Sequence, residues 1–448
     1  MLTLFIKLQK SFEEFMKNGW KLLLEGNLYE TELNLQTILN EFHDELMAFL
    51  LEEIGSSAEL KARLQKLGQS RGMGKFRERE TKLQLCTGTW VRYRSFYAER
   101  VSRRHEGTRH MSHLYWNCYE KASPLYGSRV SLLSVMCPSF EVASQVMKQV
   151  QINGNYSRMR KISLAWGRQL QKLGARALLA RGETLKGKRV AVLLDGGRSR
   201  MRCYTGDYNE KGQAEFDTPW CEPRLIVIQV LDEKGNVDRE HSLPLYWVDI
   251  QKADEHFENL KELLISLKIN EAQEVQFLAD GAKFIWQRIR QTFIDCGVSP
   301  RKLTRTLDYY HAAQHLHELV KMLPGKKQEK STLLLELKDH LWNGLINSLE
   351  RGVKNYLRQK GKIFSKKIEN SLDYFIRHYD HMQYAKFKRK KLLCGSGIVE
   401  SAIRRIINLR FKSASSFWLK ENLETLIPLR CAFLAGRWNY LIHSLIAC

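Results

Sequence analysis

Several features that assign proteins to common classes are absent from this 448-residue sequence. Its nine cysteines are dispersed and form no C-x-x-C pair, which argues against a disulfide framework and a zinc knuckle. No apolar stretch approaches the roughly 18 residues that a membrane-spanning helix needs. The first residues carry Lys7, Lys10, Glu13 and Glu14 where a signal peptide has its apolar segment. These absences predict a cytoplasmic protein.

Proline and acidic residues are also scarce. Only 8 residues are proline and 44% are hydrophobic, which excludes a disordered chain and allows a large buried core, about three domains at roughly 150 residues each. Lys and Arg number 72 against 49 Asp and Glu, so the formal net charge is +23. Such a surplus indicates a polyanionic partner, either nucleic acid or an acidic membrane surface, and the lack of a membrane segment favours nucleic acid.

The N-terminal part of the sequence combines helices with a basic hairpin. Apolar spacing predicts helices within residues 1–68, interrupted by Gly-Ser-Ser at 55–57. Residues 61–109 hold 14 Lys or Arg against 4 Glu, and residues 82–99 predict two strands joined at Thr87-Gly88-Thr89. Aromatic residues alternate with the basic ones there. Both a nucleic-acid surface and an ordinary solvated hairpin have this pattern.

Residues 139–173 predict a helix, a turn and a second helix. Ser139 is a candidate N-cap, and the second helix, over 156–173, carries Arg158 and Lys161 among its basic residues. A helix-turn-helix with a basic recognition helix has this form, but so does a plain pair of basic helices. In the first case Arg158 and Lys161 are predicted to read DNA.

Beyond residue 185 apolar strands alternate with helices, which predicts an α/β sheet domain. Strands are expected over 188–195, 225–231, 275–280 and 303–308, and helices over 254–267 and 281–293. Residues 312–382 predict helices only. Two further helices are expected over 398–411 and 417–446.

Two of these strands end in aspartate followed by glycine, in LLDGG at Asp195 and LADGA at Asp280. This pattern places a carboxylate at the rim where open α/β sheets bind ligands. Neither a G-x-G-x-x-G motif nor a Walker P-loop is present, so a nucleotide-binding sheet is not indicated. Two carboxylates suit Mg²⁺ or Mn²⁺, although Asp-Gly after a strand is also a common turn.

Glu400 is a third acidic candidate because it is isolated in a basic tract. Nine Lys or Arg lie between residues 386 and 415, and Glu400 is the one acidic residue among them. In a phosphodiester-processing site the bases hold the backbone and the carboxylate holds a cation. The alternative is a carboxylate that interacts with a helix N-terminus.

Three blocks of the sequence resemble bacterial insertion-sequence transposases of the DDE type, in the Kra-type branch. The blocks are LLDGG, then LADGAKFIWQRI with LDYYHAAQHL, and a C-terminal block that begins GSGIVES. This last block has Arg410, Lys412, Ser415 and Trp418 in the family's order, and the likeness covers roughly residues 125–445.

The resemblance implies an α/β catalytic core, an RNase H-like mixed sheet with a helical insertion, preceded by a mainly helical N-terminal DNA-binding region. The implied parts are a helical segment over 1–68, a basic hairpin with a helix-turn-helix-like region over 69–180, the first part of the core over 181–311, the insertion over 312–392, and catalytic helices over 393–448. Asp195, Asp280 and Glu400 would form the catalytic and metal-binding triad, with Asp308 and His311 ancillary. The predicted DNA contacts are Arg158, Lys161, Arg404, Arg405, Arg410, Lys412 and Trp418.

The implied activity is metal-dependent cleavage and strand transfer of DNA with two Mg²⁺ or Mn²⁺ ions. Its partners would be double-stranded transposon ends and target DNA, bound by a homodimer or higher oligomer in the nucleoid of a bacterial cytoplasm, without a membrane. Two alternatives remain open. One is an RNase H-like nuclease or resolvase without strand transfer. The other is a non-catalytic, transposase-derived DNA-binding protein, which the loss of an acidic residue would have favoured.

Overall fold

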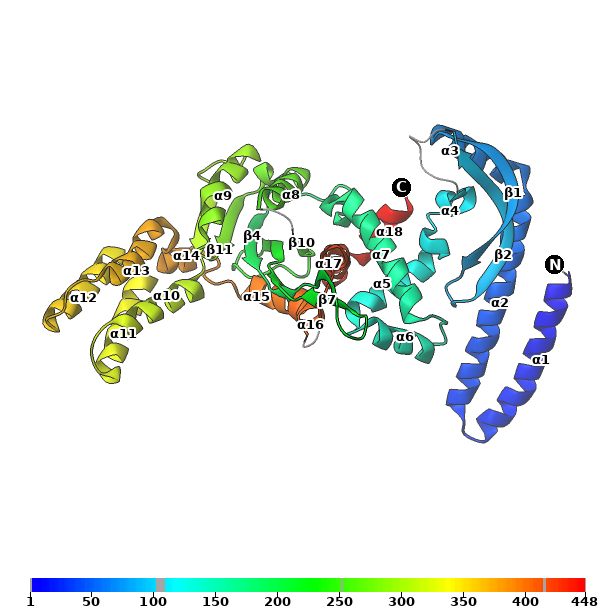
Figure 1. Cartoon of the computed structure of the whole chain (residues 1–448), viewed down its shortest axis with the longest axis horizontal. Helices are drawn as coiled ribbons and strands as arrows, with labels where there is room; N and C mark the ends of the chain where they lie inside the picture. The colour runs from blue at the N-terminus through cyan, green and yellow to red at the C-terminus, as the bar shows by residue number, and fades with distance from the viewer. Residues whose placement is uncertain (1, 102–108, 251–252, 414–415, 448) are drawn as a thin grey trace. The chain divides into compact units, whose positions relative to one another are not determined.

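The computed structural model describes residues 2–101, 109–250, 253–413 and 416–447, and the chain divides into two compact units (Figure 1). The first unit comprises residues 1–172 with 442–448, and the second comprises residues 173–441. Within the described ranges no helix has the length and apolar character needed to cross a membrane.

The first unit begins with the helices that the sequence predicts. Helices α1 (Leu2–Leu24) and α2 (Leu28–Ser56) pack against each other, as the two blue helices of Figure 1 show. Helix α3 (Ala58–Ser70) begins directly after Ser57, whose side chain accepts a hydrogen bond from the Leu60 amide. The predicted break at residues 55–57 is therefore confirmed, and Ser57 provides its N-cap.

The basic hairpin is confirmed and is longer than predicted. Strand β1 (Met73–Gln84) pairs antiparallel with β2 (Trp90–Arg100), and the short β3 (Arg109–His110) joins the edge of β2. In β2 the side chains of Val91, Tyr93 and Ser95 are buried while those between them are exposed. This alternation buries one face of the hairpin, which packs against α2, and leaves Arg92 and Arg94 on the solvent face.

Four helices complete the described part of this unit before residue 172: α4 (Met111–Tyr115), α5 (Pro124–Met136), α6 (Phe140–Gln149) and α7 (Tyr156–Leu173). Ser139 caps α6 as predicted, since its side chain accepts a hydrogen bond of 3.0 Å from the Val142 amide. Every residue of α7 from 162 to 167 is buried. This helix is therefore a core element over much of its length.

The second unit is built on a five-stranded mixed sheet in the order β10-β9-β4-β11-β12. Strands β4 (Arg189–Gly196), β11 (Glu274–Ala279) and β12 (Leu303–Leu307) are parallel, whereas β9 (Arg224–Leu231) is antiparallel to both β4 and β10 (Leu245–Asp249). Helices α8 (Ala253–Ser266) and α9 (Lys283–Asp295) occupy the predicted connections. The four predicted strands are confirmed, and β10 is an addition.

Between β4 and β9 the chain forms two small ribbons that the sequence did not predict. Strand β5 (Ser199–Arg200) pairs with β8 (Trp220–Cys221), and β6 (Cys203–Tyr208) pairs with β7 (Ala214–Asp217). Every residue of β6 is exposed. Because these strands bury little apolar surface, their sequences lack the alternation of apolar and polar residues that predicts a strand.

The helices predicted over 312–382 follow β12 and are confirmed. They are α10 (Tyr309–Met322), α11 (Lys327–Trp342), α12 (Ile346–Gln359) and α13 (Lys366–Arg377), and α14 (Tyr384–Arg389) follows them. Leucines from these helices share one buried apolar cluster with Phe375 and Tyr384. Leu307 of β12 belongs to the same cluster, so the core of these helices is continuous with the sheet.

After the insertion the chain returns to the sheet through α15 (Gly397–Ile403), a π-helical turn over Arg404–Asn408 and α16 (Leu409–Phe411). The single helix predicted over 417–446 is wrong, because two helices, α17 (Lys420–Leu434) and α18 (Trp438–Ile446), occupy that range. Arg437 lies in the break, 2% exposed, and its guanidinium binds Glu183 and three backbone carbonyls. A straight helix would withdraw this side chain from those partners.

Candidate active site

Three aspartates lie in register at the carboxyl ends of the three parallel strands. Leu194 pairs with Ala279, and Ala279 pairs with Leu307, so the next residues of the three strands are Asp195, Asp280 and Asp308. Neighbouring strands are about 4.8 Å apart, so consecutive members of this row lie close together. The sequence predicted the first two as catalytic and the third as ancillary.

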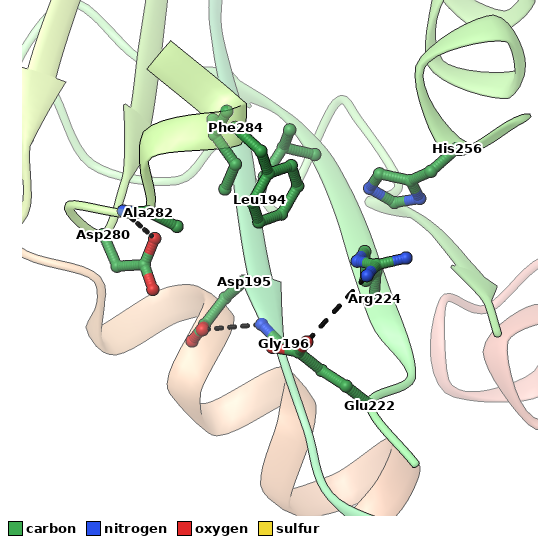
Figure 2. Close-up of a pocket in the computed structure, with 10 residues that line it drawn as sticks. Leu194, Asp195, Gly196, Glu222, Arg224, His256, Asp280, Ala282 and Phe284 are labelled. Atoms are coloured by element: carbon green, nitrogen blue, oxygen red, sulfur yellow. Dashed lines mark hydrogen bonds and ion pairs between the residues drawn. The ribbon is translucent and has the colours of Figure 1, made fainter. Parts of the chain in front are cut away.

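Asp195 and Asp280 share one small cavity (Figure 2). The cavity measures about 20 Å³, enough for a water molecule or an ion. One oxygen of Asp195 accepts the Gly196 amide at 2.7 Å, and one oxygen of Asp280 accepts the Ala282 amide at 3.1 Å. The second oxygen of each carboxylate has no hydrogen bond to any described residue. Two hard oxygen donors therefore stand side by side with ligand capacity left.

The electrostatics of Asp195 match this arrangement. Burial raises the pKa of Asp195 to about 6, and the nearby carboxylates of Asp280 and Asp308 act in the same direction. The Gly196 amide and His311 oppose the shift. A buried carboxylate with a raised pKa beside a second carboxylate is typical of a site where a cation offsets the charge.

Asp308 differs from the other two because both of its carboxylate oxygens form hydrogen bonds with neighbouring residues. It is 1% exposed and accepts the amides of Tyr310 at 3.0 Å and Ser396 at 3.2 Å, together with the Ser396 hydroxyl. His311 Nδ1 lies 3.3 Å from its other oxygen. Burial alone would raise the pKa of Asp308, but these hydrogen bonds outweigh it and hold the pKa below its usual value. The same contact with Asp308 raises the pKa of His311. Asp308 therefore ties the start of α10 to the loop before α15.

Glu400 is exposed on α15, one turn after Ser396, whose carbonyl accepts the Glu400 amide at 2.9 Å. Helix α15 packs on β4, and the side chains of Ile403 and Ile407 lie against Gly197, two residues after Asp195. No three His, Cys, Asp or Glu side chains in the described ranges form a group that could hold a metal ion. The three-carboxylate site remains a prediction.

Sequence reasoning missed Glu222 and Arg224, which line the same cavity. A Cβ placed on Gly196 would lie 2.5 Å from Glu222 Oε1, and Arg224 Nη2 lies 3.9 Å from Glu222 Oε2. These residues reach the site through the antiparallel pairing of β9 with β4, in which Gly196 faces Arg224. Their positions depend on this long-range pairing, so no local sequence signal marks them.

The residues predicted to contact DNA near Glu400 divide into two groups. Arg404, Arg405 and Lys412 are exposed. Arg410 is instead 3% exposed, with its guanidinium 4.9 Å from the ring of the half-buried Trp418. The guanidinium of Arg410 therefore packs inside the unit, and its contact with DNA remains a prediction. Ser415 lies outside the described residues.

A similar difference separates Arg158 from Lys161 on α7. Arg158 donates to the Gln84 side chain at 3.2 Å and to the Glu120 carbonyl, and its guanidinium lies 5.1 Å from the Trp90 ring. Burial lowers the pKa of Arg158. Lys161 is exposed on the same helix. Arg158 therefore makes its contacts within the first unit, and Lys161 alone of the two is exposed.

Alanine substitutions of Arg158 and Lys161 are expected to have different effects on DNA binding and on folding stability. Lys161→Ala is expected to weaken DNA binding without changing the thermal midpoint of unfolding. Arg158→Ala is expected to cost about 1–3 kcal/mol of folding stability, because Gln84 and the Glu120 carbonyl lose a charged donor. Thermal melts and binding titrations of the two variants measure both effects. A stable Arg158→Ala protein that loses only sequence discrimination would restore the recognition-helix interpretation.

Comparisons with known proteins add little to this geometry. No protein-family model matches the sequence, and no curated protein matches it. Among solved structures, the Drosophila P element transposase strand transfer complex aligns with 71% of this chain and 80% of that chain, at 11% sequence identity and a TM-score of 0.25. A likeness at that TM-score carries no argument about fold or activity.

Proposed function

We propose that the protein is a DDE-type transposase of an insertion sequence, which cleaves DNA at the element ends and joins it to a target. The observation that carries the proposal is the in-register pair Asp195 and Asp280, which opens on one cavity. The strand order and the helical insertion between β12 and α15 agree with the RNase H-like core that the sequence resemblance implies.

The residues present fit a divalent metal of the Mg²⁺ or Mn²⁺ kind. Asp195 and Asp280 offer hard oxygen donors, and Glu400 is the proposed third ligand on α15. When bound, two such ions activate the attacking hydroxyl and stabilise the leaving oxygen. Asp308 and His311 hold the loop before α15 in place, and Arg404, Arg405 and Lys412 neutralise DNA phosphates.

The proposed partners are double-stranded transposon ends and target DNA. Two ends must be held together for joining, so the active form is proposed to be a homodimer or higher oligomer. The basic outer face of the β1–β2 hairpin, with Arg92 and Arg94 exposed, supplies further phosphate contacts in the first unit.

The test uses the purified full chain and labelled duplexes taken from the DNA that flanks its reading frame. With Mg²⁺ or Mn²⁺ we expect nicks at defined positions and then joined products on a target plasmid, and neither with EDTA. Defined nicks without joined products would assign the protein to the nuclease alternative. Binding without any metal-dependent cleavage would assign it to the non-catalytic alternative.

The exposed arginines of the π-helical turn give a prediction of their own. Replacing Arg404 and Arg405 together by Ala should lower the slope of log K against log salt by about 0.9 for each lost phosphate contact. The matched control is Arg351→Ala with Arg358→Ala, two exposed arginines on α12, which should leave the slope unchanged. Equal slopes for the Arg404/Arg405 variant and the parent would mean that these side chains do not reach DNA.

A further inference from the structure

A second cavity of the same unit is large, aromatic and basic. It measures about 630 Å³, within the range of sites that hold small organic molecules. Its lining includes three aromatic rings and three lysines, which are Tyr309, Tyr310, Trp342, Lys234, Lys388 and Lys391. No aspartate or glutamate lines it. None of these six side chains lines the cavity that Asp195 and Asp280 share.

The aromatic side of the cavity is held in place by its own packing. The Tyr309 ring meets Trp342 edge to face at 5.1 Å, and Tyr384 packs on Tyr309 at the same distance. Tyr310 is 66% exposed, and its ring lies beside Gly395, where an added Cβ would stand 2.6 Å from it. Packing therefore sets the orientations of Tyr309 and Trp342 before any ligand binds, and Tyr310 adds an exposed ring.

The three lysines of the cavity are exposed, and Lys234 interacts electrostatically with the carboxylate of Asp232 beside it. Lys234, Lys388 and Lys391 come from the β9–β10 turn, from α14 and from the loop after α14. Among the described residues none of the three forms an ion pair with a carboxylate. Three cations that gather at one cavity whose lining includes no carboxylate favour an anionic ligand.

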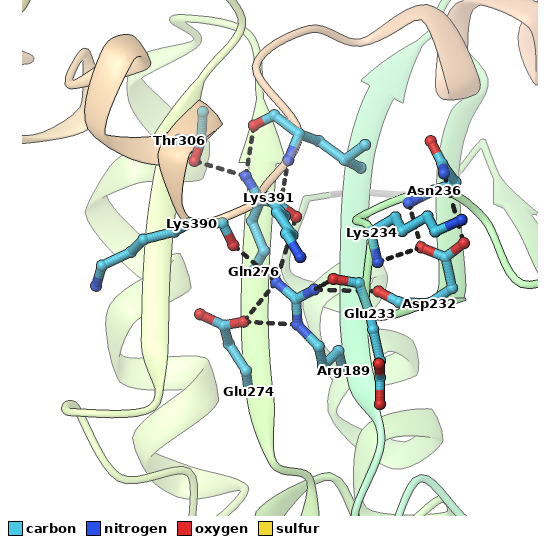
Figure 3. A network of polar contacts seen from close by, with 11 residues as sticks. Arg189, Asp232, Glu233, Lys234, Asn236, Glu274, Gln276, Thr306, Lys390 and Lys391 are labelled. Atoms are coloured by element: carbon cyan, nitrogen blue, oxygen red, sulfur yellow. Dashed lines mark hydrogen bonds and ion pairs between the residues drawn. The ribbon is translucent and has the colours of Figure 1, made fainter.

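A half-buried polar network sets the positions of two of these lysines (Figure 3). Arg189 donates to the carbonyls of Lys390 at 3.0 Å, Lys391 at 3.2 Å and Asp232 at 3.0 Å, and its Nη2 lies 2.9 Å from Glu274. Gly235 has φ of +81°, and a Cβ there would collide with the Lys391 carbonyl. The turn that carries Lys234 is thus fixed directly against the loop that carries Lys391.

We propose that this cavity binds one unpaired nucleotide of a DNA strand, with its base against Tyr310 and Trp342 and its phosphates at the three lysines. Every base has a face that stacks on an aromatic ring. The phosphates supply the negative charge that no aspartate or glutamate of the lining provides. The identity of the strand as DNA rests on the proposed function.

The position of the cavity connects it to the carboxylate site. Gly395 lies against the Tyr310 ring, and a Cβ on Gly395 would be 3.7 Å from Asp308. The next residue, Ser396, donates to Asp308 and precedes α15 with Glu400. A strand that binds at Asp195 and Asp280 can therefore place a neighbouring nucleotide in this cavity.

The test measures binding of a single-stranded oligonucleotide containing 2-aminopurine, whose fluorescence is quenched by stacking, in EDTA so that no cleavage occurs. Tyr310→Ala is expected to weaken binding by about 5- to 100-fold and to reduce the quench. Replacing Lys234, Lys388 and Lys391 together by Gln is expected to lower the salt slope by about 2, at about 0.7 for each contact. The controls are Tyr379→Ala and the triple change of Lys327, Lys362 and Lys367 to Gln, which alter exposed residues of the insertion outside the cavity.

Each outcome decides the proposal. Equal affinity and quench for Tyr310→Ala and Tyr379→Ala, with unchanged melting curves, would overturn it. A free mononucleotide, dAMP, forms the second arm. If dAMP binds the parent as tightly as the oligonucleotide does, the site takes a free nucleotide and the assignment to a strand is wrong. Asp195→Asn should keep full oligonucleotide binding in EDTA, so loss of cleavage and loss of this site are measured separately.

Discussion

Replacing Asp195 or Asp280 by Asn is expected to reduce Mg²⁺-dependent DNA cleavage by about a thousandfold or more, because ligands of one metal site act as a unit. Each change keeps the shape of the side chain and removes one hard anionic ligand from the shared cavity. DNA affinity in EDTA should hold or rise slightly, since a negative charge near phosphate is lost. Gel assays of cleavage and filter binding of the same preparations measure the two effects.

The third ligand is decided by two matched variants. Glu400→Gln is expected to match the aspartate variants, whereas Glu222→Gln, which removes the exposed carboxylate beside Gly196, should cleave at a rate near the parent's. Asp207→Asn on the exposed strand β6 is the control and should have little effect. If Glu222→Gln abolishes cleavage and Glu400→Gln does not, the third ligand is on β9's side of the cavity and the family resemblance at Glu400 misassigns it.

Replacing Asp195 and replacing Asp308 by Asn are expected to change folding stability in opposite directions. Asp195→Asn should raise the free energy of unfolding by about 2 kcal/mol at pH 7.5, because it removes a half-buried carboxylate whose pKa is raised to about 6. Asp308→Asn should lower it by about 3 kcal/mol, because the buried charge that accepts the Ser396 and Tyr310 amides is lost. Urea denaturation of both variants and the parent measures the difference.

The dependence of these two effects on pH has opposite signs. The folded pKa of Asp195 lies above its unfolded value, so its ionisation costs stability as pH rises from about 4 to about 6 and the cost is constant above. The gain from Asp195→Asn should therefore vanish near pH 4. The folded pKa of Asp308 is lowered, so its contribution is present above the unfolded pKa and is lost as pH falls through the folded pKa. A loss of stability on Asp195→Asn at pH 7.5 would contradict the raised pKa.

Local sequence patterns were enough for most helices and strands of the chain. The four apolar strands over 188–308 lie where they were predicted, because runs of core residues between polar turns need no distant partner to be recognised. The N-cap at Ser139 and the hairpin turn at Thr87-Gly88-Thr89 are equally local. The prediction of one helix over 417–446 failed because Arg437, in the break, is held by partners outside the segment, the Leu178 carbonyl and the Glu183 carboxylate.

The sequence by itself determined the types of most elements, the basic surplus and the strand-end positions of Asp195 and Asp280. The tertiary structure alone decided that Asp308 lies in register with them. It also decided that the carboxylate oxygens of Asp308 form hydrogen bonds with Ser396, Tyr310 and His311. It also decided that Arg158 and Arg410 point into the protein, and that Tyr310 and three lysines meet at one cavity. Residue type and spacing predict on which face of its own helix or strand a side chain lies. Which partner that face then meets depends on strand order and on loops that close over long sequence distances.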